Sequence, residues 1–287
     1  MVGPLFIVSM IFAFFLFFAY QRFQKKIFQI MAMLYFVLFS MTSLGLGGYL
    51  IYTSDINLIH AISLPSDENR KVTNHQPIHK TMSTKRQRSV QMQIPKARQF
   101  PELPRGCEVT SLSMLLRYHE ITIDKLQLAE QIKKDTTPYQ VKNGKVHFGN
   151  PHNGFVGSMY TYDQPGYGVY HEPIYQLTKQ HAGNRAENLT KSSFTEILNR
   201  IHQKQPVLII TNITYEPLPQ SSFQTWQTPD GPIEVTRKQH AVVITGYDEN
   251  DIYFNDPYDG EHKKAPKRPF IAAWEQMGKQ AVTITNR

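Results

Sequence analysis

The apolar residues of this 287-residue chain are concentrated in two long runs near its beginning, and the chain after residue 53 has the composition of a water-soluble protein. Residues 5–20 and 27–52 are almost wholly apolar. A helix of roughly 20 apolar residues crosses the hydrocarbon core of a bilayer, so the second run is long enough and the first lies near the lower limit. The sequence therefore predicts a transmembrane hairpin over residues 1–52.

Basic residues between the two runs indicate how this hairpin is oriented. Arg22, Lys25 and Lys26 lie in the short loop 21–26, and the positive-inside rule assigns such a loop to the cytoplasm. We therefore expect a cell-membrane protein with two spans and an extracytoplasmic remainder. The alternative for residues 1–20 is a cleaved signal peptide, although this stretch lacks the basic n-region of such peptides.

Residues 53–98 have little apolar periodicity and are expected to form a basic, flexible stalk. Residues 66–98 contain eight Lys or Arg against two Asp or Glu. Two interpretations remain open. The stalk is either a solvated spacer or a segment that contacts anionic lipid or an anionic wall polymer.

Charge in the expected globular part, residues 99–287, is balanced, with twenty basic and twenty acidic residues. The chain's net charge of +8 therefore lies outside this part, which argues against nucleic acid as its partner. A single cysteine excludes an internal disulfide. One cysteine with scattered histidines gives no zinc-ligand spacing, and we expect neither a metal nor a cofactor.

The single cysteine, Cys107, lies where a helix is expected to begin. Pro104 and Gly106 disfavour helix before it, and an apolar stripe at helical spacing follows to about Tyr118. A thiol in the first turn of a helix feels the positive end of the helix dipole, so we expect a lowered pKa and a reactive thiolate. Glu108 next to it is expected to cap the helix or to bind a substrate cation.

The remaining residues predict helices first and strands second, which is typical of an α+β fold. Ser193 and Glu196 fit a capping box. Asp248 and Asp251 bound an expected hairpin turn. The expected helices are 124–132, 173–181 and 193–203, the expected strands are 206–213, 239–246, 252–255 and 281–285, and 135–170 and 223–230 are expected loops.

Two of these strands bring a histidine and an aspartate together. His240 begins one strand and Asp256 ends its antiparallel neighbour, so both lie at the same end of a hairpin. A nucleophilic thiol needs a base within hydrogen-bond reach, and the base needs a third group that orients it. The oxyanion needs donors, for which the backbone N–H of Cys107 and the side-chain amide of Gln99 are the candidates.

Residues 90–287 resemble the bacterial papain-like cysteine peptidases related to bacteriocin-leader peptidases, family thirty-nine of the cysteine peptidases, and within them the stand-alone surface-anchored branch of Gram-positive bacteria. The resemblance implies a papain-like fold, with Cys107 as nucleophile, His240 as general base and acid, Asp256 as orienting group and Gln99 as oxyanion donor. In the leader peptidases the glutamine lies six residues before the cysteine, where this chain has Pro101. The matching stretches are 103–111, 154–157, 165–168, 226–231, 240–247 and 255–257.

The same resemblance suggests four substrate-binding candidates, Gly157, Tyr167, Gly168 and Trp226. The loop 154–170 is expected either to line the cleft or to cover the sheet, and Trp226 either to form a cleft wall or to fill the core. The leading functional hypothesis is hydrolysis of a peptide bond in a peptide or protein substrate through a thioester. Two alternatives remain, an amidase or transpeptidase acting on cell-wall peptides and a non-catalytic module that binds peptide or glycan.

Overall fold

The computed structural model describes residues 33–35, 37–38, 40–41 and 89–286. The first three groups are helical. Most of the two predicted spans, and the stalk up to residue 88, lie outside the described residues. Among the helices that the structure does describe, none is both long and apolar enough to cross a membrane.

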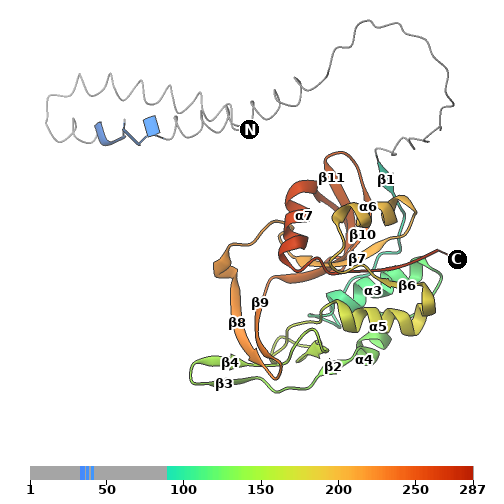
Figure 1. The fold of residues 1–287 in the computed structure, drawn as a ribbon, viewed down its shortest axis with the longest axis horizontal. Helices are drawn as coiled ribbons and strands as arrows, with labels where there is room; N and C mark the ends of the chain where they lie inside the picture. Colours follow the sequence, from blue (N-terminus) through green and yellow to red (C-terminus); the bar gives the residue numbers. More distant parts are fainter. Residues whose placement is uncertain (1–32, 36, 39, 42–88, 287) are drawn as a thin grey trace, which may run out of the picture. The chain divides into compact units, whose positions relative to one another are not determined.

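A seven-stranded antiparallel sheet forms the centre of the domain (Figure 1). Its strands follow the order β12-β11-β10-β7-β13-β6, and β1 also pairs with β10. The continuous apolar run of β7 is buried at every position, as expected for a central strand covered on both faces. The strands are β1 (Val90–Gln91), β6 (Ala186–Asn188), β7 (Val207–Asn212), β10 (Gln239–Tyr247), β11 (Asp251–Asp256), β12 (Glu261–Pro266) and β13 (Ala281–Ile284).

Helices cover both faces of this sheet. Leu208 and Ile210 of β7 pack with α3, α4 and α5, whereas Val207 and Ile209 pack with α6 and α7. This alternation follows from the two-residue period of a strand. The helices are α3 (Cys107–Tyr118), α4 (Lys125–Gln131), α5 (His171–Ala182), α6 (Phe194–His202) and α7 (Lys267–Gln276).

The predicted helices are confirmed, and their caps explain where they begin. Asp124 caps α4 in a complete capping box with Gln127. The Ser193 hydroxyl accepts a hydrogen bond from the backbone N–H of Glu196 at the start of α6. The α+β class is thus confirmed, although α7 lies among the C-terminal strands and departs from the expected order of helices first and strands second.

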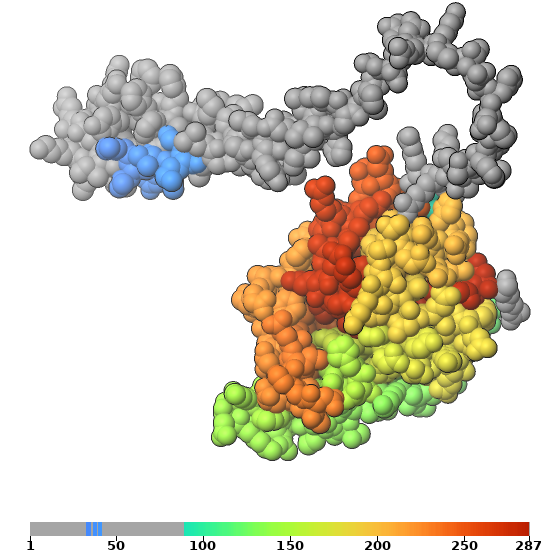
Figure 2. Space-filling view, in the orientation of Figure 1, coloured from blue at the N-terminus to red at the C-terminus, as the bar shows by residue number. Residues whose placement is uncertain are grey.

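A second, four-stranded sheet corrects the two expected loops. Residues 223–230, predicted as a loop, contain the strand β8, and its partner β9 was not predicted. Together with β3 and β4 they form a lobe at one side of the domain, green and orange in Figure 2. β2 and β5 make a separate two-stranded parallel pair. These strands are β2 (Lys134–Asp135), β3 (Gln140–Lys142), β4 (Lys145–His147), β5 (Phe155–Val156), β8 (Phe223–Thr228) and β9 (Gly231–Thr236).

The expected boundary between stalk and domain at residue 98 is wrong by about ten residues. Val90 pairs with Tyr247, and Met92 and Ile94 are buried against the same sheet. The side-chain amide of Asn255 donates to the carbonyl of Ile94 at 3.1 Å. Residues 90–98 therefore belong to the folded domain, where they run along β10 and β11 toward Gln99.

Candidate active site

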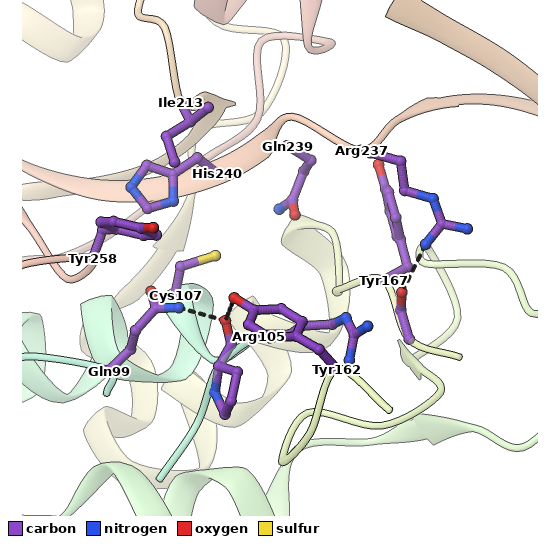
Figure 3. Close-up of a pocket in the computed structure, with 12 residues that line it drawn as sticks. Gln99, Arg105, Cys107, Tyr162, Tyr167, Ile213, Arg237, Gln239, His240 and Tyr258 are labelled. Atoms are coloured by element: carbon purple, nitrogen blue, oxygen red, sulfur yellow. Dashed lines mark hydrogen bonds between the residues drawn. The ribbon is translucent and has the colours of Figure 1, made fainter. Parts of the chain in front are cut away.

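A cavity of about 310 Å³ lies where the beginning of α3 meets the beginning of β10. Cys107, His240 and Gln99 all line it (Figure 3). Cys107 is the first residue of α3, and Gly106 is its N-cap. A Cβ at Gly106 would lie 2.5 Å from the Cβ of Leu103, so the glycine permits the tight approach that starts the helix at the cysteine.

The α3 helix is fastened to β10 beside the thiol. The Ser111 hydroxyl donates to the carbonyl of Ala241 at 3.2 Å, with both groups buried. Ala241 directly follows His240. Ser111 lies one helical turn after Cys107, so this hydrogen bond keeps the cysteine and the histidine at the same cavity.

The thiol of Cys107 donates a hydrogen bond to Oε2 of Glu108 at 3.3 Å. Glu108 is completely buried. Its other oxygen, Oε1, accepts from the backbone N–H of Val169 at 2.9 Å and from Nε2 of Gln239 at 3.1 Å. Glu108 therefore neither caps α3 nor reaches the cavity, and the expectation of a capping or cation-binding role is wrong.

The expected lowering of the Cys107 pKa is also wrong for this arrangement. Burial of the thiol and the adjacent Glu108 carboxyl raise its pKa well above the ordinary value, and the N–H of Ala241 offsets only part of this. Burial likewise raises the pKa of Glu108, although four hydrogen-bond donors favour its ionised form. Desolvation and a neighbouring acid outweigh the helix dipole here.

His240 and Asp256 form a buried hydrogen-bonded pair with 2.7 Å between Nε2 and Oδ1. They lie at the same end of the β10–β11 hairpin, as their positions in the sequence predict. Because Nε2 is engaged by the carboxylate, Nδ1 is the ring nitrogen left for the thiol. In Figure 3 the His240 ring lies over the Cys107 side chain, whose sulfur points toward Gln239.

Asp256 is held by more donors than the sequence suggested. Oδ2 accepts from the Tyr215 hydroxyl at 2.5 Å and from Lys263 Nζ at 2.7 Å, and Oδ1 also accepts from the Tyr258 backbone N–H at 2.9 Å. Burial opposes ionisation, but the hydrogen bonds from His240, Lys263 and Tyr215 more than compensate. The pKa of Asp256 therefore lies well below its usual range.

Gln99 reaches the cavity although it lies eight residues before Cys107. Its Nε2 donates to the carbonyl of Pro104 at 2.7 Å, and this leaves the second N–H of the amide unused. Oε1 is buried without a partner among the described residues. The turn 100–106 brings the amide under the cysteine in Figure 3, so the departure from the six-residue spacing does not remove it from the site.

Only Tyr167 of the four substrate-binding candidates lines the cavity. Trp226 has no exposed surface and packs on Tyr167 and Phe148. Of its two expected roles, it therefore fills the core and does not form a cleft wall. Gly157 has φ +74° and pairs with Gly166, which makes it a turn position in the loop. It does not line this cavity, and its assignment to substrate binding stays a prediction.

Gly168 does not line the cavity either and packs behind it, so its assignment to substrate binding also stays a prediction. A Cβ there would overlap Oε1 of Glu108 and approach Oε1 of Gln239 to 2.8 Å. The glycine therefore provides room for the buried Glu108–Gln239 pair.

Several cavity residues were not predicted from the sequence. Their signal was their position, because most lie within three residues of a predicted site residue. None of the residues that line the cavity is acidic. The additional lining residues are Pro104, Arg105, Tyr162, Gly166, Ile213, Arg237, Gln239 and Tyr258. Within the described part of the chain, no cluster of three or more His, Cys, Asp or Glu is arranged to hold a metal ion.

Comparison with known proteins agrees with this architecture. The model of the Peptidase_C39-like family matches residues 89–282, so the chain belongs to that family. It is 43% identical over 184 residues to the uncharacterized protein YvpB of Bacillus subtilis (strain 168), covering 64% of this chain and 70% of YvpB. A crystal structure described as a C39-like peptidase from Bacillus anthracis is 44% identical, with a TM-score of 0.65, over 69% of this chain and 98% of that one.

Proposed function

We propose that this protein is a cysteine peptidase that hydrolyses a peptide bond through a thioester on Cys107, with His240 as base and acid and Asp256 as the group that orients His240. The observation that carries the proposal is the meeting of Cys107 and the buried His240–Asp256 pair at one cavity. Membership of the family supports a papain-like peptidase fold. Anchoring through residues 1–52, with the domain outside the cytoplasm, is part of the proposal as predicted from the sequence.

The chemistry begins with rotation of the Cys107 side chain away from Glu108 toward Nδ1 of His240. His240 accepts the thiol proton, and the sulfur attacks the peptide carbonyl. The C–N bond then breaks, and the amine leaves with the proton that His240 held. Water, activated by the same ring, hydrolyses the thioester and restores the thiol. The Cys107 N–H at the unpaired start of α3 and the free N–H of Gln99 would stabilise the oxyanion.

Substitution of the nucleophile and the base tests this proposal. Cys107→Ala and His240→Ala should abolish hydrolysis of a peptide library by the full-length protein, and an exposed variant such as His202→Ala should retain it. Undiminished hydrolysis by Cys107→Ala would reject the mechanism.

One observation favours a second candidate, the non-catalytic binding module. The Cys107 thiol donates to a carboxyl group and its pKa is raised, as expected for a thiol that is not a nucleophile. Ordinary iodoacetamide reactivity of Cys107, together with peptide binding that Cys107→Ala leaves intact, would favour this alternative.

A further inference from the structure

Two arginines project into the cavity from opposite walls. Arg105 precedes Cys107 by two residues, and Arg237 precedes His240 by three. Figure 3 shows both guanidinium groups on the Tyr167 side of Cys107, away from Tyr258. Because both side chains line the cavity that Cys107 and His240 line, they face the part of a substrate that is close to the scissile bond.

Neither arginine has an acidic partner. Among the described residues, no ion pair includes Arg105 or Arg237. Nη1 of Arg105 donates to the carbonyls of Ser158 and Thr161, and Nη1 of Arg237 donates to the carbonyl of Gly166 at 3.0 Å. A guanidinium group has five N–H donors, so most donors of both groups remain for a ligand.

The surroundings hold these like charges near each other at an energetic cost. Burial and the charge of Arg237 both lower the pKa of Arg105, whose guanidinium also lies over the Tyr162 ring at 4.8 Å. A Cβ at Gly166 would lie 3.1 Å from Cδ and Nη1 of Arg105, so the glycine provides the room that the Arg105 side chain occupies. An anionic ligand would relieve the repulsion, and paired N–H donors bind a carboxylate in bidentate fashion.

We infer that the substrate carries a carboxylate within about two residues of the scissile bond, and that Arg105 and Arg237 bind it. The range follows from the roughly 3.3–3.6 Å that each extended residue spans. The carboxylate belongs either to an Asp or Glu side chain or to a free C-terminus. This inference rests on the proposed peptidase function.

The test compares cleavage of peptide sets by the full-length protein. One set is acetylated and amidated and carries Glu, Gln or Lys at each position in turn, and a second has neutral side chains and a free or amidated C-terminus. We expect the Glu set or the free-carboxylate set to be cleaved at least about tenfold faster than its neutral counterpart by kcat/KM. The two sets separate the side-chain source from the terminal one.

Substitutions then assign the preference to the two arginines. Arg237→Gln and Arg105→Gln should each reduce the preference about tenfold, whereas Arg268→Gln, an exposed control on α7, should preserve it. Arg237→Glu should favour the Lys peptides. Arg105 is partly buried and donates to two loop carbonyls, whereas Arg237 is exposed and donates to one, so we expect the Arg237 variants to retain the fold, as checked by thermal melting.

A second measurement needs no cleavable substrate. The rate of Cys107 alkylation by anionic iodoacetate is divided by the rate with neutral iodoacetamide, using glutathione as the reference thiol. We expect a higher ratio in the protein, reduced by Arg237→Gln and by 1 M salt.

The outcomes distinguish the two proposals. Equal cleavage of charged and neutral peptides, or an alkylation ratio no higher than that of glutathione, overturns the carboxylate site, while loss of hydrolysis in Cys107→Ala still supports the peptidase. Hydrolysis that survives Cys107→Ala rejects the peptidase mechanism. If no peptide is cleaved, the alkylation ratio and its response to Arg237→Gln decide the carboxylate site alone.

Discussion

The carboxyl group of Glu108 controls whether the thiol of Cys107 can ionise in the observed rotamer. Sγ and Oε2 are 3.3 Å apart, and both are buried. Two negative charges at that separation repel by about 5 kcal/mol at an effective dielectric constant near 20. The thiolate therefore forms only when Glu108 takes up a proton or when the sulfur turns toward His240.

Glu108→Gln removes this repulsion with little change in shape. The amide oxygen can continue to accept from Val169 and Gln239, and the amide nitrogen then faces the sulfur as a donor. The substitution should lower the Cys107 pKa, because an acid is replaced by a group that stabilises the thiolate. Rotation of the wild-type thiol relieves part of the repulsion, so we expect alkylation at pH 7 to accelerate at least about tenfold, or about 1.4 kcal/mol.

The assay is the rate of iodoacetamide alkylation from pH 4 to 10, followed by intact mass. Cys107 is the only cysteine, so every mass increment of a thiol adduct reports on this residue. The Glu108→Gln profile should move to lower pH, and Glu130→Gln, an exposed carboxylate on α4, should leave it in place. A Glu108→Gln profile that coincides with the wild type or moves to higher pH refutes the reasoning.

Three further substitutions test the packing and charge around the site. Asp256→Asn removes a carboxylate whose lowered pKa stabilises the fold at neutral pH, and this stabilisation is lost as the pH falls through the acidic range. Urea unfolding from pH 7 to 3 should therefore show a flatter decline of the free energy of unfolding in the variant. An unchanged decline would contradict this. Gly168→Ala adds a Cβ against Glu108 and should destabilise the fold by about 1–3 kcal/mol, measured by urea unfolding; equal stability would show that the pair has room to move. Trp226→Ala should cost about 3–5 kcal/mol in the same assay with hydrolysis of the residual folded protein retained, and a selective loss of hydrolysis without destabilisation would reassign Trp226 to the cleft.

Local patterns predicted the elements that carry the candidate triad. The apolar stripe after Cys107 gave the start of α3, and the short turn at Asp248 gave the β10–β11 hairpin with His240 and Asp256 at one end. Both depend on neighbours in the chain, since the Asp248 carboxylate accepts from the N–H groups of Asn250 and Asp251. Local patterns of this kind predict structure correctly because the interactions that stabilise them involve only residues close in the chain.

Elements supported by distant partners were missed. β8 does not alternate between buried and exposed positions, because Trp226 is its only buried residue. α7 has Pro269 in its first turn, which reads as a helix breaker in sequence but is tolerated there, since the N–H groups of that turn have no partner within the helix. The direction of the Cys107 pKa shift could not be predicted from the sequence either, because it depends on burial and on the orientation of Glu108.

The pairing of β1 with the far end of β10 fixes the place where the chain enters the folded domain. Gln91 lies opposite Gly246, six residues along the strand from His240, or about 20 Å at the rise of a β-strand. The described chain therefore enters the domain at the end of β10 that is remote from the cysteine, so substrate access to Cys107 and the entry of the chain lie at opposite ends of one strand.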